Sequence, residues 1–270
     1  MDVLDTTENR HDGKSLEAVL ANGYTFNLGD YLNKAFKLFG NDAGSYIGFV
    51  LVSFAISFAI GMIPIGILSS IIGLVINPAI NGGWYIFGQK HNTGQQRSFS
   101  NFFDGFKNPP WLQLVLGSFI SSIFIGIAVL LIILPAGAFI GMDYFMDLAS
   151  LKNMRDPEEM TAILSGLFAG KILLVVLLAV LVGCLIAVLY LFMPLFIIFR
   201  GMSFWEAMEA SRKVVSKNYI QVLLFLILLG ILLVVGAMIC LVGLLVAVPI
   251  YFLAVYSAFE DIMGTGESHS

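Results

Sequence analysis

Charge is missing from long parts of this chain. Only 12% of the residues are charged, 59% are hydrophobic and the mean hydropathy is +0.92, which lies outside the usual range of soluble globular proteins. A helix that crosses the hydrocarbon core of a bilayer needs about 20 mostly apolar residues. Four stretches of at least that length contain no Asp, Glu, Lys or Arg: 43–89, 108–142, 172–199 and 218–259. The sequence therefore predicts an integral membrane protein and excludes a soluble globular fold.

Residues for catalysis and metal binding are equally scarce. The chain has two cysteines, Cys184 and Cys240, and both lie in apolar stretches, so we interpret them as packing residues. The three histidines lie in polar termini or a loop and show no metal-ligand spacing. HExxH, GxSxG and GxxxxGK[ST] motifs do not occur, no ionisable residue lies at the middle of a span, and no basic stripe could bind nucleic acid. We therefore expect no catalytic residue, no metal and no cofactor, and a protein that is not an enzyme.

Turn residues divide the charge-free stretches into six spans. The sequence GMIPIG at 61–66 and the glycine-bearing segment 236–243 each predict a tight turn between two spans, and Pro135 is expected to end the third. The fold class predicted is an all-α membrane protein with six transmembrane helices. The spans are expected at about 44–62, 65–87, 111–134, 172–199, 219–235 and 244–258.

Lys and Arg indicate the orientation, because they accumulate in cytoplasmic loops. With the N-terminus inside, eleven of the fourteen lie in inner segments and three, Lys152, Arg155 and Lys171, lie outside. We predict a multi-pass protein of the bacterial inner membrane with both termini in the cytoplasm. The domain division expected is a flexible polar tail at 1–25, without a removable signal peptide, a single membrane domain at 26–262, and a flexible tail at 263–270.

An internal repeat is a further prediction. Amphipathic segments that begin at Phe26, Ser98 and Ser203 each precede a pair of spans on the predicted cytoplasmic side. The second span of each pair carries a proline: Pro78, Pro194 and Pro249. This order predicts three units, each an amphipathic helix lying in the headgroup layer followed by two spans.

The outer segment at about 141–170 is expected to form a helical hairpin. Asp156, Pro157, Glu158 and Glu159 combine a capping side chain, a first-turn proline and acids at the positive end of the helix dipole, which predicts a helix start. Gly166 and Gly170 are expected to mark a bend into the fourth span. A third-ranked alternative is a membrane enzyme whose cation would be bound by outer acids, namely Asp143, Asp147, Asp156, Glu158 and Glu159.

The most distinctive polar motif within a span is INPAINGG at 76–83. Asn77, Pro78 and Asn81 are typical of a helix that is interrupted to expose backbone groups to a substrate. The alternative is a proline kink whose free carbonyl is bonded by Asn81 or by a neighbouring helix. The serines of the spans are interpreted as packing residues.

Charged residues near the cytoplasmic helix ends form a second candidate site. Glu206 or Glu260 is predicted to pair with Arg200 or Arg212, which would fasten the third amphipathic helix to the bundle. Asp261 adjoins Glu260 and is included in this interface. Solvated interface charges without a site are the alternative.

Much of the chain resembles a known group of proteins. SFWEAMEASRKVVSKN, GLLVAVP and AVYSAFEDI, with GFVLV and FFDGF in the first half, carry the likeness. The chain resembles uncharacterised bacterial six-span membrane proteins related to the membrane domain of some glycerophosphodiester phosphodiesterases. The resemblance implies a six-span fold and no established activity. Its residues are Phe204, Glu206, Ala207, Ser211, Asn218, Gly243, Pro249, Tyr256, Glu260 and Asp261, with Asp104 in FFDGF.

Two functions rank above the membrane enzyme. The leading hypothesis is a non-enzymatic membrane protein that interacts with membrane lipids or organises a membrane protein partner, which could be a second copy of the chain. The alternative is a transporter or channel for a neutral or apolar solute, based on the repeats and on Asn77. Neither hypothesis includes a nucleic-acid partner.

Overall fold

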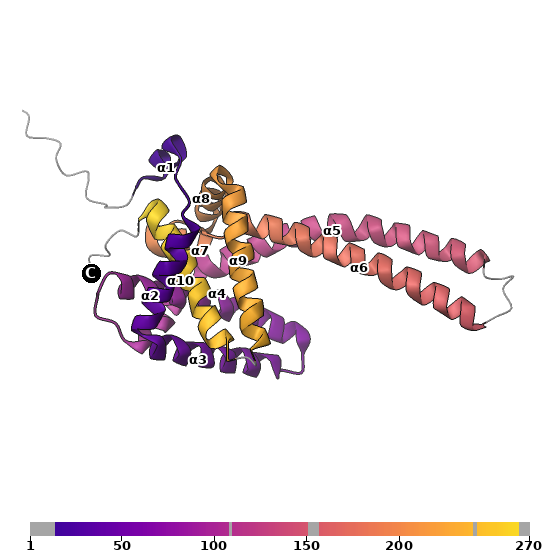
Figure 1. The fold of residues 1–270 in the computed structure, drawn as a ribbon, viewed down its shortest axis with the longest axis horizontal. Helices are drawn as coiled ribbons and strands as arrows, with labels where there is room; N and C mark the ends of the chain where they lie inside the picture. The colour runs from indigo at the N-terminus through magenta and orange to yellow at the C-terminus, as the bar shows by residue number, and fades with distance from the viewer. Residues whose placement is uncertain (1–13, 108–109, 151–156, 240–241, 265–270) are drawn as a thin grey trace, which may run out of the picture. The chain divides into compact units, whose positions relative to one another are not determined.

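The described part of the chain is helical. The computed structural model describes residues 14–107, 110–150, 157–239 and 242–264, and these contain ten α-helices, one 3-10 helix and no strand (Figure 1). Six helical segments among them are long and apolar enough to cross a membrane. This confirms an all-α, multi-pass membrane protein.

Long and short helices alternate along the chain. The short elements lie between or before the spans: α1 (Leu16–Asn22), α2 (Leu28–Asn41), η1 (Phe99–Phe106) and α8 (Phe204–Lys217). The segments that form the spans are α3 (Ala43–Gly61), α4 (Gly66–Asn92), α5 (Pro110–Ser150), α6 (Pro157–Leu189), α7 (Met193–Arg200), α9 (Tyr219–Met238) and α10 (Leu244–Met263).

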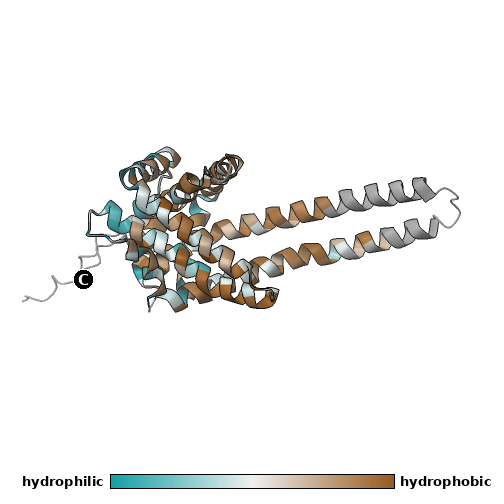
Figure 2. Cartoon of the chain, turned by 90° about the horizontal axis from the view of Figure 1, so that it is seen from below, coloured by the Kyte–Doolittle hydropathy of each residue, from teal (hydrophilic) through white to brown (hydrophobic). Residues whose placement is uncertain are grey.

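The contacts within the chain divide it into two compact units, and the single membrane domain over 26–262 stays a prediction. One unit holds the described residues up to Phe119 and those from Val188 onward, and the other is Ile120–Ala187. The second unit consists of most of α5 and α6, whose residues are apolar over most of the coloured length (Figure 2). Within it, Gly183 of α6 faces Ile125 and Val129 of α5, and a Cβ atom at Gly183 would lie 3.5 Å from the Val129 side chain.

The third span differs from its predicted limits. Pro135 lies inside α5, which continues to Ser150, because a proline removes one hydrogen bond but need not end a long helix. The predicted outer hairpin is not separate from the spans, because α5 continues to Ser150 and α6 begins at Pro157. Helix α6 runs through Gly166 and Gly170 without a break. The helix start at Pro157 is confirmed, while Asp156 lies outside the described residues. The predicted span 172–199 agrees with the candidate span Leu173–Arg200, within which α6 ends at Leu189 and α7 begins at Met193.

The N-terminal region is corrected as well. Residues 16–22, assigned above to a flexible tail, form α1, which begins with the Ser15 hydroxyl accepting a hydrogen bond from the Ala18 N–H. Val19 is buried, the Tyr24 hydroxyl donates to the Val214 carbonyl at 3.0 Å, and Asn218 donates to the Tyr24 carbonyl at 2.7 Å. The segment before α2 is thus attached to the end of α8.

The core of the first unit surrounds α10. This span has 61% of its most apolar window buried, more than any other span, and it packs against α2, α3, α4 and α9. Leu253, Tyr256 and Phe259 of α10 are fully buried. Because α10 has few exposed side chains, most of the apolar outer surface of the first unit comes from its other spans.

The amphipathic character of two predicted segments is confirmed. In α2, Tyr31, Ala35 and Leu38 are buried, and in α8 the buried face runs from Ala207 to Val215 while the charged residues face outward. The segment starting at Ser98 forms the 3-10 helix η1, in which Phe102 is buried and the other three phenylalanines are partly exposed. The threefold repeat and a location in the headgroup layer remain predictions.

Candidate functional site

A polar groove of about 520 Å³ lies between α3, α4 and α5 of the first unit. Asn77 and Asn81 of α4 both line it, together with Pro78. Six of its lining residues carry a hydroxyl or an amide, and they come from three different spans: Ser57, Ser69, Ser70, Asn77, Asn81 and Ser118. The structure thus brings the predicted motif together with serines that the sequence could only suggest as packing residues.

The polar groups in the groove are not equally satisfied. Ser69 and Ser70 donate to the Gly66 carbonyl at 2.9 and 2.8 Å, which is the usual bond of a serine back to its own helix. Ser57, Asn77 and Asn81 are exposed, and their side chains make no hydrogen bond to any other described residue. An amide without a partner costs several kcal/mol in hydrocarbon. These three side chains therefore require a partner that the isolated chain does not supply.

Helix α4 is not interrupted at the motif, which corrects the predicted helix break. It is continuous from Gly66 to Asn92 with Pro78 inside it. Pro78 has no N–H, so the Leu74 carbonyl lacks its usual donor four residues later, and Leu74 lines the groove. The indole N–H of Trp111 on α5 donates to the neighbouring Val75 carbonyl at 3.4 Å. A neighbouring helix thus bonds the carbonyl next to the one that Pro78 leaves free, and a donor to the Leu74 carbonyl itself stays a prediction.

The glycines of the motif have a packing role. Gly83 lies against the backbone of η1, and a Cβ atom there would be 1.7 Å from the Phe102 carbonyl oxygen. Gly105 of η1 meets α4 in the same way, since its Cβ atom would be 2.0 Å from the Ala79 carbonyl oxygen. This approach places the centroid of the Phe102 ring 3.9 Å from the centroid of the Phe87 ring. Gly83 is explained by backbone contact, while Gly82 packs against side chains, with Leu114 Cδ1 of α5 3.0 Å from where its Cβ atom would lie.

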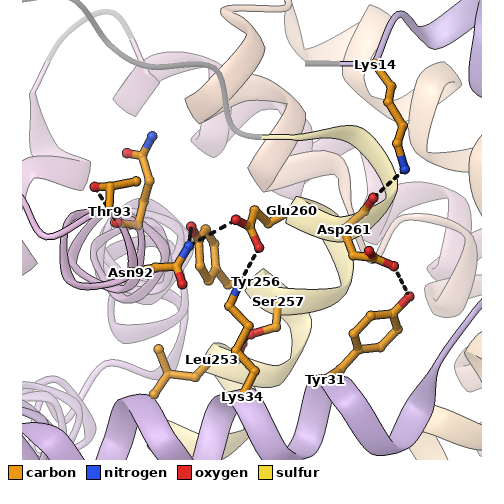
Figure 3. Close-up of polar contacts among 11 residues, drawn as sticks. Lys14, Tyr31, Lys34, Asn92, Thr93, Leu253, Tyr256, Ser257, Glu260 and Asp261 are labelled. Atoms are coloured by element: carbon orange, nitrogen blue, oxygen red, sulfur yellow. Dashed lines mark hydrogen bonds and ion pairs between the residues drawn. The ribbon is translucent and has the colours of Figure 1, made fainter. Parts of the chain in front are cut away.

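The charged residues at the end of α10 have partners other than those predicted. Glu260 forms an ion pair with Lys34 of α2, and it accepts a hydrogen bond from Asn92 of α4 at 3.0 Å (Figure 3). Asn92 also donates to the Tyr256 hydroxyl at 3.3 Å. The predicted pairing of Glu260 with an arginine is therefore wrong. Glu260 instead joins α2, α4 and α10 at one end of the bundle.

Asp261 and Arg200 complete this end of the molecule. The Tyr31 hydroxyl donates to the Asp261 carboxylate at 2.8 Å, and Lys14 donates to the Asp261 carbonyl at 2.9 Å (Figure 3). Burial raises the pKa of Tyr31 well above its usual value, and the Asp261 carboxylate raises it further, so the phenol stays protonated. Arg200 donates to the main-chain carbonyls of Met263, Gly264 and Lys14. It caps α10 and makes no ion pair among the described residues.

Glu206 and Arg212 act within α8 and do not fasten it to the bundle. Glu206 bonds the backbone and hydroxyl of Ser203 in a capping box, which lowers the pKa of the carboxyl group. Arg212 pairs with Glu209 at 2.7 Å on the exposed face of the same helix. Both interactions are local, so the predicted contact between α8 charges and the end of α10 is corrected.

The described residues contain no group of three His, Cys, Asp or Glu side chains that could hold a metal ion. Cys184 is exposed and unpaired with another cysteine, while Cys240 and Asp156 lie outside the described residues. The side chains of the other outer acids proposed as cation ligands also lie outside what the structure describes: Asp143, Asp147, Glu158 and Glu159.

The serines of the groove were missed although a signal for them exists. Ser57 lies five residues before Met62, and Ser69 and Ser70 lie four and five residues after Ile65. Two antiparallel helices joined by a short turn place positions equally far from the turn at the same depth. Counting outward from the turn would therefore have paired these serines. The partners of Glu260 carry no comparable signal.

Comparisons with known proteins gave no relative from which a function could be inferred. No family model, curated protein or solved structure matches the chain. The resemblance to the six-span family remains a prediction.

Proposed function

We propose that this chain is a non-enzymatic, lipid-interacting protein of the bacterial inner membrane that holds a membrane amphiphile in the α3–α4–α5 groove. The observation that carries the proposal is the set of three unpartnered polar side chains in spanning helices: Ser57, Asn77 and Asn81. A ligand that forms hydrogen bonds with them offsets their desolvation, which is worth about 1–3 kcal/mol for each polar group.

The surroundings of the groove favour an amphiphile over a wholly polar solute. Large apolar side chains at the same end of α3 and α4 are strongly exposed, among them Phe58 at 71% and Ile67 at 77%. Such side chains suit the acyl chains of a lipid, while the groove suits its polar part. A volume of about 520 Å³ is within the range of small-ligand sites, roughly 300–1,000 Å³.

The opposite end of the protein supports contact with lipid headgroups. Aromatic side chains on α2, η1 and α8 are exposed, including Phe36 at 48% and Trp205 at 58%, and aromatic residues favour the membrane interface. Lys107, Lys213 and Lys217 are exposed on or beside η1 and α8. Each cation near an anionic surface contributes about 1 kcal/mol.

Native mass spectrometry of the purified full chain tests the proposal. We expect a bound lipid on the wild-type protein and its loss from a variant carrying both Asn77→Leu and Asn81→Leu. Asn33→Leu, on an exposed position of α2 outside the groove, is the matched control and should keep the lipid. An oligomer that dissociates in the double variant, with no lipid in either protein, would show that a second copy fills the groove and would refute the proposal.

A transporter for a neutral or apolar solute is the second candidate. The groove extends along α4 from Ser69 to Asn81, about 18 Å of helix, which is half or more of the hydrocarbon thickness. Solute flux into proteoliposomes that disappears in the Asn77→Leu and Asn81→Leu variant would favour this function over simple binding.

A further inference from the structure

The wall of the groove is polar but carries no formal charge. Among the described residues that line it there is no Asp, Glu, Lys or Arg, and there is no aromatic ring. The nearest charged residue further along α4 is Lys90, nine residues or about 13 Å of helix beyond Asn81. A phosphate in the groove would therefore lack a counter-charge, and a choline would lack both an acid and an aromatic cage. Charged headgroups are disfavoured on both counts.

The hydrogen-bonding groups of the groove include both donors and acceptors. Each of Asn77 and Asn81 provides an amide with two N–H donors and one acceptor oxygen, and the Ser57 hydroxyl provides both functions. Ser69 and Ser70 donate to Gly66, so their oxygens remain as acceptors. An alcohol group both donates and accepts, so a free hydroxyl matches this wall better than a headgroup whose polar atoms only accept, such as an ionised phosphate.

The position of the groove indicates from which leaflet the ligand enters. The groove starts beside the turn between α3 and α4, where Gly61 and Ser69 line it, and ends near the middle of α4 at Asn81. The charged end of α4, with Lys90, lies in the other direction. A lipid of the leaflet on the side of the turn can therefore place its polar part in the groove by lateral movement.

We infer that the groove selects an uncharged headgroup with a free hydroxyl, as the glyceryl group of a diacylglycerol has, from the leaflet on the side of the α3–α4 turn. The inference rests on the proposed lipid-binding function and names its ligand class. The same chemistry occurs in a free polyol, so the source of the glyceryl group must be determined separately.

Binding to three probes tests the inference on the full chain in nanodiscs or mild detergent. Diacylglycerol and phosphatidic acid with the same acyl chains differ by the phosphate, and glycerol presents the hydroxyl groups without the chains. We expect diacylglycerol to bind about ten-fold more tightly than phosphatidic acid. The preference should disappear in the variant with Asn77→Leu and Asn81→Leu. It should weaken in Ser57→Ala, and it should persist in Ser53→Ala, one turn away on α3 and outside the groove.

Each outcome separates the inference from the function on which it rests. Equal binding of diacylglycerol and phosphatidic acid, both lost in the asparagine variant, would overturn the headgroup selectivity and leave lipid binding supported. Binding of neither lipid and no glycerol binding would overturn both. Saturable glycerol binding without diacylglycerol binding would support the hydroxyl chemistry but would refute the proposed lipid ligand in favour of a soluble polyol. Ser57→Ala keeps the test valid if the double variant does not fold.

Discussion

The two halves of α4 differ in how their polar and small residues are used: in one half they line a groove, and in the other they pack against neighbouring helices. In the half from Ser69 to Asn81, amides and hydroxyls line an open groove, and three polar side chains around it lack a partner. In the half from Gly82 to Asn92, most residues are buried, Gly83 meets the backbone of η1, and Asn92 bonds Glu260. The first half therefore offers polar groups to a binding partner, and the second half packs within the chain.

This difference separates residues that the sequence presents as a single motif. In INPAINGG, the backbone of η1 accounts for Gly83, and the donor from Trp111 supports the turn at Pro78. The asparagines have no such role, because Asn77 and Asn81 point away from the packed side. A substitution in each half should therefore change stability in opposite directions.

The largest expected effect comes from Gly83→Ala. The new methyl group would overlap the Phe102 carbonyl oxygen, a backbone atom that cannot move without displacing η1. We expect a loss of about 3 kcal/mol or more in the free energy of unfolding, or failure to purify as a monodisperse protein. Thermal unfolding in detergent measures this.

Gly126→Ala is the control for that substitution, because a Cβ atom at Gly126 would have no atom outside its own helix within 4 Å. It should be neutral or slightly stabilising, since alanine has the higher helix propensity. Wild-type stability of Gly83→Ala would contradict the close contact between α4 and η1.

The ion pair between Lys34 and Glu260 should have the next largest effect. Both side chains are partly exposed, at 34% and 26%, so the coupling is moderate. A double-mutant cycle with Lys34→Met and Glu260→Gln should give a coupling free energy of about 1 kcal/mol. The cycle of Arg212→Met with Glu260→Gln should give a value near zero. Coupling between Arg212 and Glu260 instead would restore the pairing expected from the sequence alone.

Asn77→Leu should act with the opposite sign. It removes an unpartnered amide from the apolar depth, so in lipid-free detergent we expect the free energy of unfolding to rise by about 1 kcal/mol or to stay unchanged. Denaturant titration followed by circular dichroism measures the change. A clear loss of stability would show that the amide has a partner within the protein and would remove the main support for the groove as a binding site.

The smallest expected effect is a pH dependence at η1. Burial alone would raise the pKa of Asp104, but hydrogen bonds from Lys107, Asn101 and Lys90 outweigh it, so the pKa lies below its usual value. The stability that this carboxylate contributes is present above the unfolded pKa of 3.8 and is lost as the pH falls through the folded value.

Unfolding midpoints measured between pH 6 and pH 3 should therefore fall below about pH 4 in the wild type. They should fall less in Asp104→Asn, which cannot titrate. An identical slope in the two proteins would assign the acid sensitivity to other carboxylates.

Local sequence patterns predicted the fold class and several helix starts, and they failed where a contact joins distant parts of the chain. Pro157 begins α6 as its flanking acids suggested, and the buried face of α8 follows its helical spacing. By contrast, Lys34 and Glu260 are separated by 226 residues, and a charge at a helix end can reach several neighbours. No local pattern distinguishes those neighbours from one another.

Long apolar runs are enough to predict six membrane-crossing helical segments, because a backbone in lipid must satisfy its hydrogen bonds internally. The sequence also marked Asn77 and Asn81 as unusual. The contacts of the folded chain were needed to show that serines from α3 and α5 share a groove with these asparagines, and that Gly83 accommodates η1. The reason is that the rotation and contact of packed helices depend on residues far apart in the chain.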